Sequence, residues 1–355
     1  MADWGAMSET TSPADENRLT PRHVAARVED RLHRWRERSG RRRGLVPTIV
    51  PYASYGAPGW VRVLCRVVLA KPDSPPDRWS IKVRGWRSFF SVPADEGVAI
   101  VTVGATESEV PIARGGIVDA RVPADLPPGR HTIAIRTAAS QEALADVFIV
   151  DPAERFGLVS DIDDTVMVTS LPRPFLAAWN TFVVDEHARR PVAGMAVLYD
   201  RIRRQHTNAP VIYLSTGAWN VAPTLRRFLG RNLYPPGPLL LTDWGPTHDR
   251  FFRSGREHKR ESLRRLAAEF PHVRWLLVGD DGQHDEAIYG EFAREHPRNV
   301  AAVAIRQLSV GEAVLAGGRK RAEEWERDSP VRWFFAPDGA GLWEQLVAAG
   351  VIGPR

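Results

Sequence analysis

Residues 156–165 read Phe-Gly-Leu-Val-Ser-Asp-Ile-Asp-Asp-Thr, a short apolar run that ends abruptly in three carboxylates and a threonine. A buried parallel strand that brings acids to the edge of a sheet has this pattern. Asp161 and Asp163 are two residues apart, so in an extended chain they point the same way. A dication such as Mg²⁺ would relieve their repulsion and leave one carboxylate free for chemistry. The alternative is a strand that runs into an Asx-type turn or a helix N-cap.

A second apolar strand also ends in polar residues. Residues 209–217 read Ala-Pro-Val-Ile-Tyr-Leu-Ser-Thr-Gly, and a helical pattern follows over 221–228. A turn of this kind presents backbone N–H groups at a helix N-terminus, where an anion is favoured. Ser215 is therefore placed to hold a phosphate oxygen. The alternative is an ordinary strand–turn–helix in which a serine or threonine caps the helix.

Lys259 belongs to the next segment, Arg-Glu-His-Lys at 256–259, which opens an amphipathic helix. Apolar residues recur at helical spacing along it, namely Leu263, Leu266, Ala267 and Phe270. Lys259 lies near the predicted start of that helix, where the macrodipole disfavours a cation. A lone lysine on a helix is normally solvated, but this chain has few lysines among many arginines. The retained lysine indicates a need for a compact point charge.

The last segment is a second cluster of acids at a strand end. An apolar strand over 273–278 runs into Gly-Asp-Asp-Gly-Gln-His-Asp at 279–285. Asp280 would complete a metal site opposite Asp161, and Asp285 would bond a metal-bound water or orient Lys259. Taken alone the cluster could be a solvated turn; together with residues 156–165 it predicts a metal-assisted site.

These four segments resemble the four ordered motifs of the haloacid dehalogenase superfamily of phosphotransferases. The longer strings Ser-Asp-Ile-Asp-Asp-Thr at 160–165, Phe-Arg-Ser-Gly-Arg-Glu-His-Lys at 252–259 and Gly-Asp-Asp-Gly-Gln-His-Asp narrow the resemblance. They resemble the catalytic domain of the actin-patch-associated phosphatidate phosphatases, over about residues 150–310. One departure is Asp281, which stands where a small hydroxyl residue is expected and which could alter the charge of the metal site.

The resemblance implies a role for each matching residue. Asp161 would attack phosphorus and form an aspartyl-phosphate, and Asp163 would act as general acid and base. Ser215 and Lys259 would bind the phosphoryl oxygens. Mg²⁺ would be held by Asp161, Asp280 and the backbone carbonyl of Asp163. Supporting roles fall to Thr165, which fixes the loop, and to Thr216, Asp281 and Asp285.

The pattern along the chain predicts an α/β fold, a doubly wound, Rossmann-like parallel sheet of the haloacid dehalogenase type, preceded by a small β-sandwich. Its strands are expected over 156–161, 210–215, 238–242, 273–278 and 300–306. The segment after Arg306 is expected to form surface helices, with Trp325, Trp333 and Trp343 as packing anchors. The predicted parts are a basic N-terminal segment over 1–44, the sandwich over 45–151, the catalytic domain over 152–310 and a helical extension over 311–355.

Composition favours a cytoplasmic enzyme. The only cysteine is Cys65, the N-terminus lacks the pattern of a secretory signal, and no apolar run is long enough to span a bilayer. The net charge of +5 could attract anionic lipid or nucleic acid, or could reflect a general bias toward arginine.

Spacing between the motifs leaves little room for a lid over the site. Only 54 positions separate Asp161 from Ser215, and 44 separate Ser215 from Lys259. An open site suits a substrate whose bulk stays outside, such as a lipid in a bilayer, a protein or a polynucleotide. Loops near the strand ends carry aromatic residues beside arginines, which an anionic membrane interface selects. They are Trp179, Trp219, Trp244, Phe251 and Phe252, with Arg173, Arg250, Arg253 and Arg256. The competing interpretation buries most of these rings against the sheet.

Three functions therefore remain open. The favoured one is a Mg²⁺-dependent phosphatidate phosphatase, which would convert phosphatidate to diacylglycerol at the periphery of a membrane. The second is a phosphatase of another large or soluble phosphomonoester, of which nucleic-acid ends are the less favoured case. The third is an inactive scaffold whose sandwich binds a protein partner that the sequence does not identify.

Overall fold

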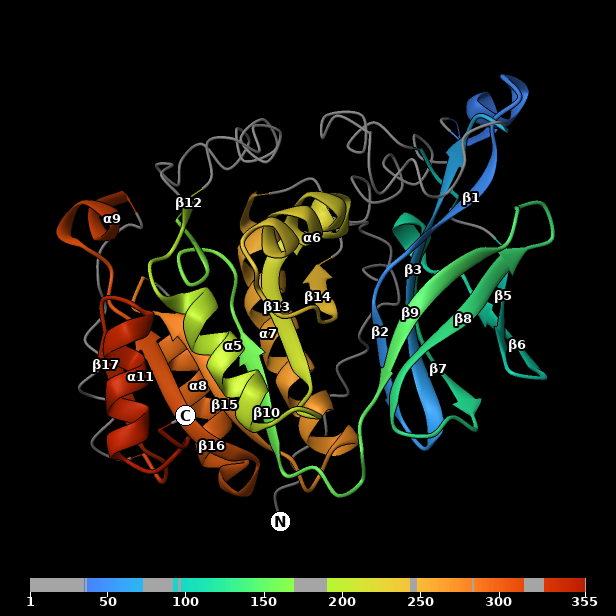
Figure 1. Cartoon of the computed structure of the whole chain (residues 1–355). Coiled ribbons are helices and arrows are strands. Elements are labelled where there is room, and N and C mark those ends of the chain that lie inside the picture. Colours follow the sequence, from blue (N-terminus) through green and yellow to red (C-terminus); the bar gives the residue numbers. More distant parts are fainter. Residues whose placement is uncertain are drawn as a thin grey trace, which may run out of the picture.

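The computed structural model describes residue 35 and residues 37–72, 92–94, 97–168, 190–242, 248–282, 284–315 and 329–354, with side chains left out at 248–254, 314 and 315. Two units follow one another along the chain (Figure 1). We call the first, β1 to β9, the β unit, and the second, from β10 onward, the α/β unit.

The β unit is built from strands that alternate buried and exposed residues. In β9, for example, Ala143, Ala145, Val147 and Ile149 are buried, and the residues between them are exposed or half-buried. This period of two is that of a sheet with one face on a core. The strands are β1 (Val46–Pro51), β2 (Ser54–Ala57), β3 (Gly59–Ala70), β4 (Val92–Pro93), β5 (Val98–Val103), β6 (Thr106–Pro111), β7 (Ile117–Ala124), β8 (Gly129–Thr137) and β9 (Ala143–Ile149).

All nine strands belong to one hydrogen-bonded sheet with the order β1-β3-β2-β9-β8-β5-β6, and β4 and β7 pair with β3. The long strand β3 has 12 residues, so it pairs with β1 and β2 on one side and with β4 and β7 on the other. The sheet encloses its own apolar core, and β6 contacts β7. The predicted two-sheet sandwich is therefore not confirmed, because β3 joins the strands into one sheet.

The α/β unit contains a six-stranded parallel sheet with the order β14-β13-β10-β15-β16-β17. Its strands are β10 (Phe156–Ser160), β13 (Val211–Ala218), β14 (Leu239–Thr242), β15 (Arg274–Asp280), β16 (Val300–Arg306) and β17 (Trp333–Ala336). A separate pair is formed by β11 (Met167–Val168) and β12 (Arg190–Pro191). The parallel sheet and its helices confirm an α/β fold. The haloacid dehalogenase type remains a prediction.

Helices cover both faces of this sheet (Figure 1). α7 and α8 contact each other on one face, and α5 and α11 contact each other on the other. The helices are α5 (Met195–Gln205), α6 (Ala222–Arg231), α7 (His248–Glu269), α8 (Asp285–Glu295), α9 (Val310–Leu315) and α11 (Gly339–Ala348). The carboxylate of Asp338 caps α11 by accepting a hydrogen bond from the backbone N–H of Gly341 at 2.9 Å.

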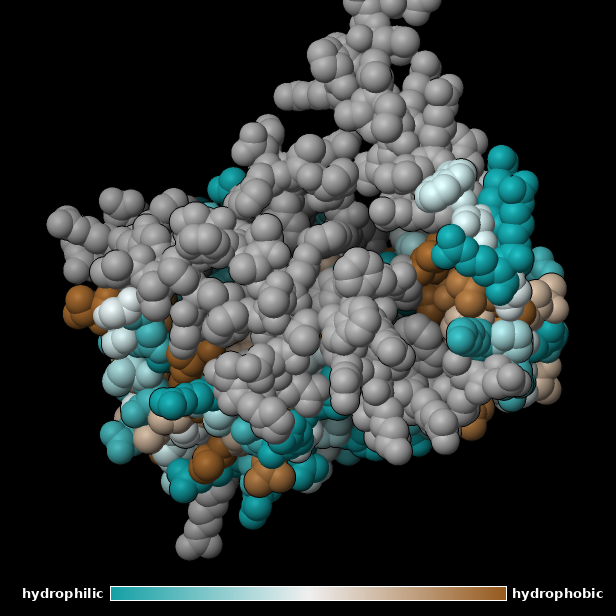
Figure 2. Space-filling model, turned by 90° about the horizontal axis from the view of Figure 1, so that it is seen from above, coloured by the Kyte–Doolittle hydropathy of each residue, from teal (hydrophilic) through white to brown (hydrophobic). Residues whose placement is uncertain are grey.

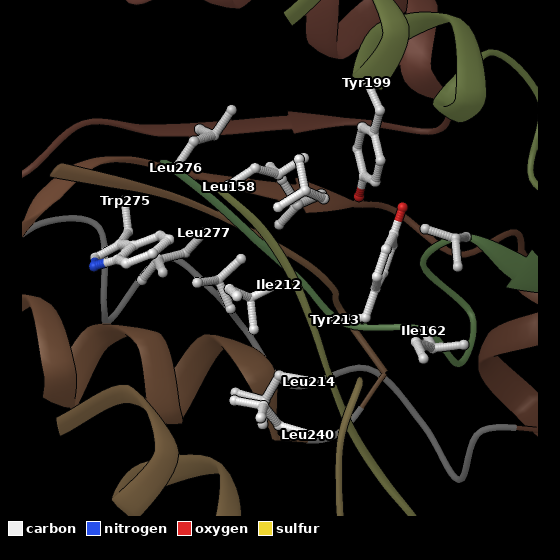
Figure 3. Close-up of a cluster of buried hydrophobic side chains, with 14 of the residues drawn as sticks. Leu158, Ile162, Tyr199, Ile212, Tyr213, Leu214, Leu240, Trp275, Leu276 and Leu277 are labelled. Atoms are coloured by element: carbon white, nitrogen blue, oxygen red, sulfur yellow. The ribbon is translucent and has the colours of Figure 1, made fainter. Parts of the chain in front are cut away.

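The centre of the sheet is buried on both faces, which explains why its strands read as continuous apolar runs. Figure 3 shows side chains of β10, β13, β14 and β15 gathered in this core, including Leu158, Ile212, Leu240 and Leu276. Parallel strands end at the same edge of a sheet. The residues that follow β10 and β15 and those near the end of β13 therefore meet there.

The strand predictions are confirmed to within a few residues, with one addition. The segment after Arg306, expected to form surface helices, also supplies β17, which extends the sheet past residue 310. Trp333 is buried in β17, as expected of a packing anchor, and Trp343 is half-buried under the Arg201 guanidinium. Trp325 lies outside the described residues. In the described part of the chain, no helix is long and apolar enough to cross a membrane.

Candidate functional site

Asp161 lies directly after β10 and is buried. Its backbone N–H donates to the carbonyl of Val278 in β15 at 2.8 Å, so its position is fixed between two central strands. One carboxylate oxygen, Oδ1, accepts a hydrogen bond from Lys259 Nζ at 2.6 Å, and the other, Oδ2, lies 3.4 Å from the hydroxyl of Thr165. The Thr165 hydroxyl thus lies beside this carboxylate, and its support of the loop stays a prediction.

Lys259 is buried between two carboxylates, because its Nζ donates to Asp161 and to Asp285 at 2.6 Å each. The predicted start of its helix was wrong: α7 begins at His248, so Lys259 lies in the middle of the helix. Gly255 lies just before the predicted start, and a glycine normally destabilises the interior of a helix. Here a Cβ at Gly255 would lie 3.1 Å from Cβ and Cγ2 of Thr216, so the glycine lets α7 approach β13.

Three carboxylates meet at the end of the sheet. Oxygen atoms of Asp161, Asp280 and Asp285 all lie within 4.8 Å of one another, and all three residues are buried. Asp280 ends β15, and its Oδ1 accepts from the N–H of Gly282 at 2.6 Å. Asp285 opens α8, where the helix dipole favours a negative charge. Asp285 was expected to orient Lys259 or to bond a metal-bound water; its Oδ1 does accept from Lys259 Nζ, and the residue also lies in the cluster itself.

Burial disfavours the ionised forms of the carboxylates in this cluster. It raises the pKa of Asp161 well above the usual value; Lys259 opposes the rise, while the Asp285 and Asp163 carboxylates add to it. Burial likewise raises the pKa of Asp280, with Asp285 and Asp161 adding to the effect. Burial alone would lower the pKa of Lys259, but Asp161 and Asp285 raise it, so the ammonium stays charged. The Lys259 ammonium thus bonds two of the three carboxylates, and a further cation would stabilise the ionised forms of all three.

Asp163 lies outside this group of three. Its Oδ2 accepts a hydrogen bond from the Ser215 hydroxyl at 3.1 Å, and Ser215 Oγ accepts from the N–H of Gly217 at 3.0 Å. The predicted phosphate-binding serine and the predicted general acid are therefore neighbours. The expectation that Asp161 and Asp163 share a cation through their side chains does not describe this arrangement; the backbone carbonyl of Asp163 stays a predicted ligand.

Two of the predicted supporting residues make contacts with other parts of the fold. Asp281 Oδ1 accepts from the N–H of Leu308 at 2.8 Å, so the carboxylate holds the loop after β16. Thr216 contributes its backbone carbonyl, which accepts from the Thr242 hydroxyl at 2.9 Å. Neither residue is in the group of three carboxylates. Asp281, which stands where the family resemblance leads one to expect a small hydroxyl residue, therefore contacts the loop after β16.

Arg306 was missed by the sequence analysis. It is buried at the end of β16, its Nη1 donates to the carbonyl of Asp164 at 2.8 Å, and its Nη2 pairs with Glu312 at 2.8 Å. Asp164 itself has φ of 58°, which aspartate tolerates better than most residues. Arg306 therefore fixes the loop that carries Asp161 and Asp163. Its place at a strand end was the signal that could have revealed it.

The aromatic residues expected at a membrane interface are only partly described. Trp219 is buried, and its ring stacks on Tyr52 of the β unit at a centroid distance of 4.8 Å, so for this residue the competing interpretation was right. The side chains of the other four aromatic residues lie outside the described residues, as do those of Arg173, Arg250 and Arg253. Figure 2 shows a mixture of hydrophilic and hydrophobic described residues around the upper face.

Gly279 permits the close packing of Asp285 against β15. A Cβ at this position would lie 2.6 Å from Asp285 Oδ2 and 2.7 Å from a ring carbon of Tyr289. Gly279→Ala is therefore expected to displace α8 and to lower the free energy of unfolding by about 1–3 kcal/mol. Urea denaturation measures this loss. Gly230→Ala is the matched control, because a Cβ there meets nothing within 4 Å. Equal unfolding midpoints for Gly279→Ala and the native chain would contradict the expectation.

The segment that carries the carboxylate cluster matches a family model. Residues 156–307 match the family model described as phosphatidate phosphatase APP1, catalytic domain. The match begins at β10 and ends after β16, so it includes the carboxylate cluster, Lys259 and Ser215. The β unit lies outside it.

Two curated proteins are similar over the same part of the chain. Phosphatidate phosphatase APP1 of Saccharomyces cerevisiae is 27% identical over 156 residues, which is 43% of this chain and 26% of the yeast protein. An uncharacterized protein of Schizosaccharomyces pombe is 25% identical over 152 residues, or 42% of this chain and 25% of that protein. The chain thus spans about a quarter of the length of the curated relatives it matches.

Among solved structures, a carbohydrate acetylesterase from Xanthomonas citri aligns with 77% of this chain and 73% of its own, at 11% identity. Its TM-score is 0.27. A similarity at that level supports no argument about fold or function.

Proposed function

We propose that this chain is a Mg²⁺-dependent phosphomonoesterase that acts through an aspartyl-phosphate. The observation that carries the proposal is the position of Asp161, 2.6 Å from Lys259 and within 4.8 Å of Asp280 and Asp285. A carboxylate nucleophile, a fixed ammonium and a cluster of acids are what phosphoryl transfer needs. The central position of β10 and the helices on both faces support a doubly wound sheet of the haloacid dehalogenase type.

The donor set fits Mg²⁺. It consists of three buried carboxylates, and carboxylate oxygens are the hard ligands that this ion prefers. When all three are ionised, their negative charge exceeds the positive charge of Lys259. Oδ2 of Asp285 is buried and has no hydrogen-bond partner among the residues that the structure describes. Asp161, Asp280 and the backbone carbonyl of Asp163 would hold the ion, with Asp285 beside them. A bound Mg²⁺ would offset the charge between the nucleophile and the phosphate.

The residues of the chain then divide the chemistry between two steps. In the first, a carboxylate oxygen of Asp161 forms a bond to phosphorus while the bond to the leaving oxygen breaks, and protonated Asp163 gives that oxygen its proton. In the second, Asp163 takes a proton from a water that attacks phosphorus, which releases phosphate and restores the Asp161 carboxylate. Lys259 and Ser215 would bind the transferring phosphoryl oxygens. An intact Asp163 favours a phosphatase, since an alkoxide leaving group must be protonated.

For the substrate we propose phosphatidate, which would be converted to diacylglycerol and phosphate by a cytoplasmic enzyme at the periphery of a membrane. The similarity of residues 156–307 to the catalytic domain of a phosphatidate phosphatase supports this choice.

A panel of substrates tests the proposal. Phosphate release is measured from phosphatidate vesicles, from a short-chain soluble phosphatidate and from a 5′-phosphorylated oligonucleotide, each with and without EDTA. We expect phosphate release from both forms of phosphatidate, and faster release from vesicles than from the soluble form. EDTA should abolish this release, and excess Mg²⁺ should restore it. Release that survives EDTA would contradict the metal site. Release from the oligonucleotide alone would favour the other phosphomonoesterase, and no release from any substrate would favour the scaffold.

A further inference from the structure

Helix α7 connects the candidate site to the β unit. Residues spaced by four, three and four lie along one side of a helix. Lys259 begins such a row with Leu263, Leu266 and, just after the helix, Phe270, and all four residues are buried. His258, Ser262, Arg265 and Glu269 form the neighbouring row, rotated by one residue. The first row contains the lysine of the candidate site, and the second provides the contacts described next.

Arg265 and Glu269 join two residues of the β unit in a chain of four alternating charges. Glu269 Oε1 lies 2.7 Å from Arg62 Nη2 of β3, and Arg62 Nη1 lies 2.6 Å from Asp119 Oδ1 of β7. Asp119 Oδ2 in turn lies 2.8 Å from Arg265 Nη1. We call these residues the α7 clamp. The Tyr55 hydroxyl of β2 completes it by donating to Glu269 Oε2 at 2.9 Å.

The clamp is sheltered at its Glu269–Arg62 end and more open at its other end, where the side chains of Asp119 and Arg265 are 30% and 25% exposed. The side chain of Glu269 is 6% exposed and that of Arg62 is 15% exposed. Burial tends to raise the pKa of Asp119, but Arg265 and Arg62 outweigh it and hold the pKa below the usual value. Ion pairs of this kind gain little net stability, because both partners lose water, but they define one geometry sharply.

Aromatic rings pack beside the clamp. Phe270 contacts Trp60 and Tyr55 of the β unit at centroid distances of 5.5 and 6.0 Å, and contacts Trp275 of β15 at 6.0 Å. The end of α7 is thus held between the β unit and the central sheet. The charge-assisted hydrogen bonds of the clamp add geometric specificity to this apolar packing.

We propose that the β unit positions Lys259: the clamp of Arg62, Asp119, Arg265 and Glu269 sets the rotation of α7 and thereby directs the lysine toward Asp161. The four residues are positioning residues and need not touch the substrate. The expected effect on turnover rests on the proposed function. The positioning of Lys259 by the clamp does not depend on it. Lys259 lies six residues, or about 9 Å along the helix axis, from Arg265, so a rotation at one is felt at the other.

Two aspartates of the β unit allow a comparison, in which the Asp146 contact is the longer and more exposed one. Asp119 pairs with Arg265 and Arg62, whereas Asp146 of β9 pairs with Arg226 of α6 at 3.5 Å. Both acids link the β unit to an arginine of the α/β unit, but only Asp119 reaches α7. Asp119→Asn removes the charge from the clamp, and Asp146→Asn removes a charge from the other contact. Asp119→Glu keeps the charge, and Glu269→Gln provides a second break in the clamp.

The first readout is Lys259 itself, measured without any substrate. The chain has four lysines, and labelling of each by an amine-reactive reagent can be followed by mass spectrometry. Lys259 is 5% exposed and paired with two acids, so it should react slowly in the native chain. We expect labelling at Lys259 to rise about fivefold or more in Asp119→Asn and Glu269→Gln, because local opening exposes it more often. Asp146→Asn and Asp119→Glu should leave it near the native rate.

The second readout is kinetic. A lysine that stabilises transferring oxygens acts chiefly in the transition state, and a misplacement of about 1 Å can cost up to roughly 100-fold. We therefore expect Asp119→Asn to lower kcat by at least about tenfold while KM changes less than about twofold. Asp146→Asn should keep the native kcat, and Asp119→Glu should recover most of it. All assays are run well below the measured Tm of each variant.

The outcomes separate the two proposals. If Asp119→Asn and Glu269→Gln lower Tm but leave Lys259 labelling and kcat unchanged, the clamp only joins the units and the inference is wrong. If Asp146→Asn has the same effects as Asp119→Asn, general loosening of the interface is the cause, which also overturns it. If the native chain releases no phosphate from any substrate, the proposed function fails, and the labelling comparison still decides the positioning of Lys259.

Discussion

Asp161→Asn is expected to reduce Mg²⁺-dependent phosphate release by roughly 10⁴-fold or more, because the amide cannot form the phospho-enzyme and loss of a nucleophile is the most severe single change in such a site. Asparagine has nearly the same shape, and its side-chain oxygen can still accept from Lys259 Nζ, now 2.6 Å from Oδ1. The fold should therefore survive, which near-ultraviolet circular dichroism and the unfolding midpoint would verify.

The control for this variant is Asp281→Asn. Asp281 is also a buried acid of the same region, but its Oδ1 accepts from the N–H of Leu308 and it is not in the group of three carboxylates. We expect it to retain most of the activity. Undiminished turnover in Asp161→Asn would refute the assignment of the nucleophile, and an equal loss in both variants would indicate a general disturbance of the loops.

Lys259→Met is expected to lower both activity and stability. It leaves Asp161 and Asp285 buried without their common cation, a loss that costs about 3–5 kcal/mol when one partner of a buried pair is removed. The pKa of Asp161, which burial already raises, should rise further once the ammonium is gone. When folding raises the pKa of a carboxyl, ionisation of that carboxyl destabilises the folded chain. The free energy of unfolding therefore falls as the pH rises. The penalty should therefore be larger at pH 8 than at pH 5.

Urea denaturation in EDTA at the two pH values measures this effect. Lys259→Arg is the control, since it keeps a positive charge near both acids and should lose less stability, although its planar group does not match the lysine geometry. Added Mg²⁺ should restore part of the stability of Lys259→Met by supplying positive charge to the native state. A penalty that is absent, or that grows toward low pH, would show that Asp161 does not depend on Lys259.

Much of the site could be predicted because it lies where strands end. Apolar runs that stop at Asp161, Ser215 and Asp280 placed these residues at one edge of a parallel sheet, and the structure brings the two aspartates within 4.8 Å. Asp285 was harder to place, since its position depends on where α8 begins after a glycine-rich turn. The close approach that Gly279 allows between β15 and Asp285 is a tertiary contact, and no local pattern encodes it.

The remaining differences also come from tertiary packing. The helix was expected to open at residues 256–259, but α7 begins at His248 and continues through Gly255, where Thr216 occupies the space that a side chain would fill. Trp219 suggested a membrane contact from its place in a loop, yet the ring stacks on Tyr52, nearly 170 residues earlier in the chain. β17 is only four residues long, too short for periodicity to distinguish it from a loop.

The short strand β17 has a practical consequence. It pairs with β16 through the backbone from Val303 to Arg306, and it lies beyond residue 307, where the family match ends. A fragment trimmed to that match would leave one side of an apolar strand with unsatisfied N–H and C=O groups. Such exposed edges template pairing between copies. We expect the trimmed fragment to self-associate, whereas a fragment that continues through Ala336 and α11 would keep β16 paired with β17.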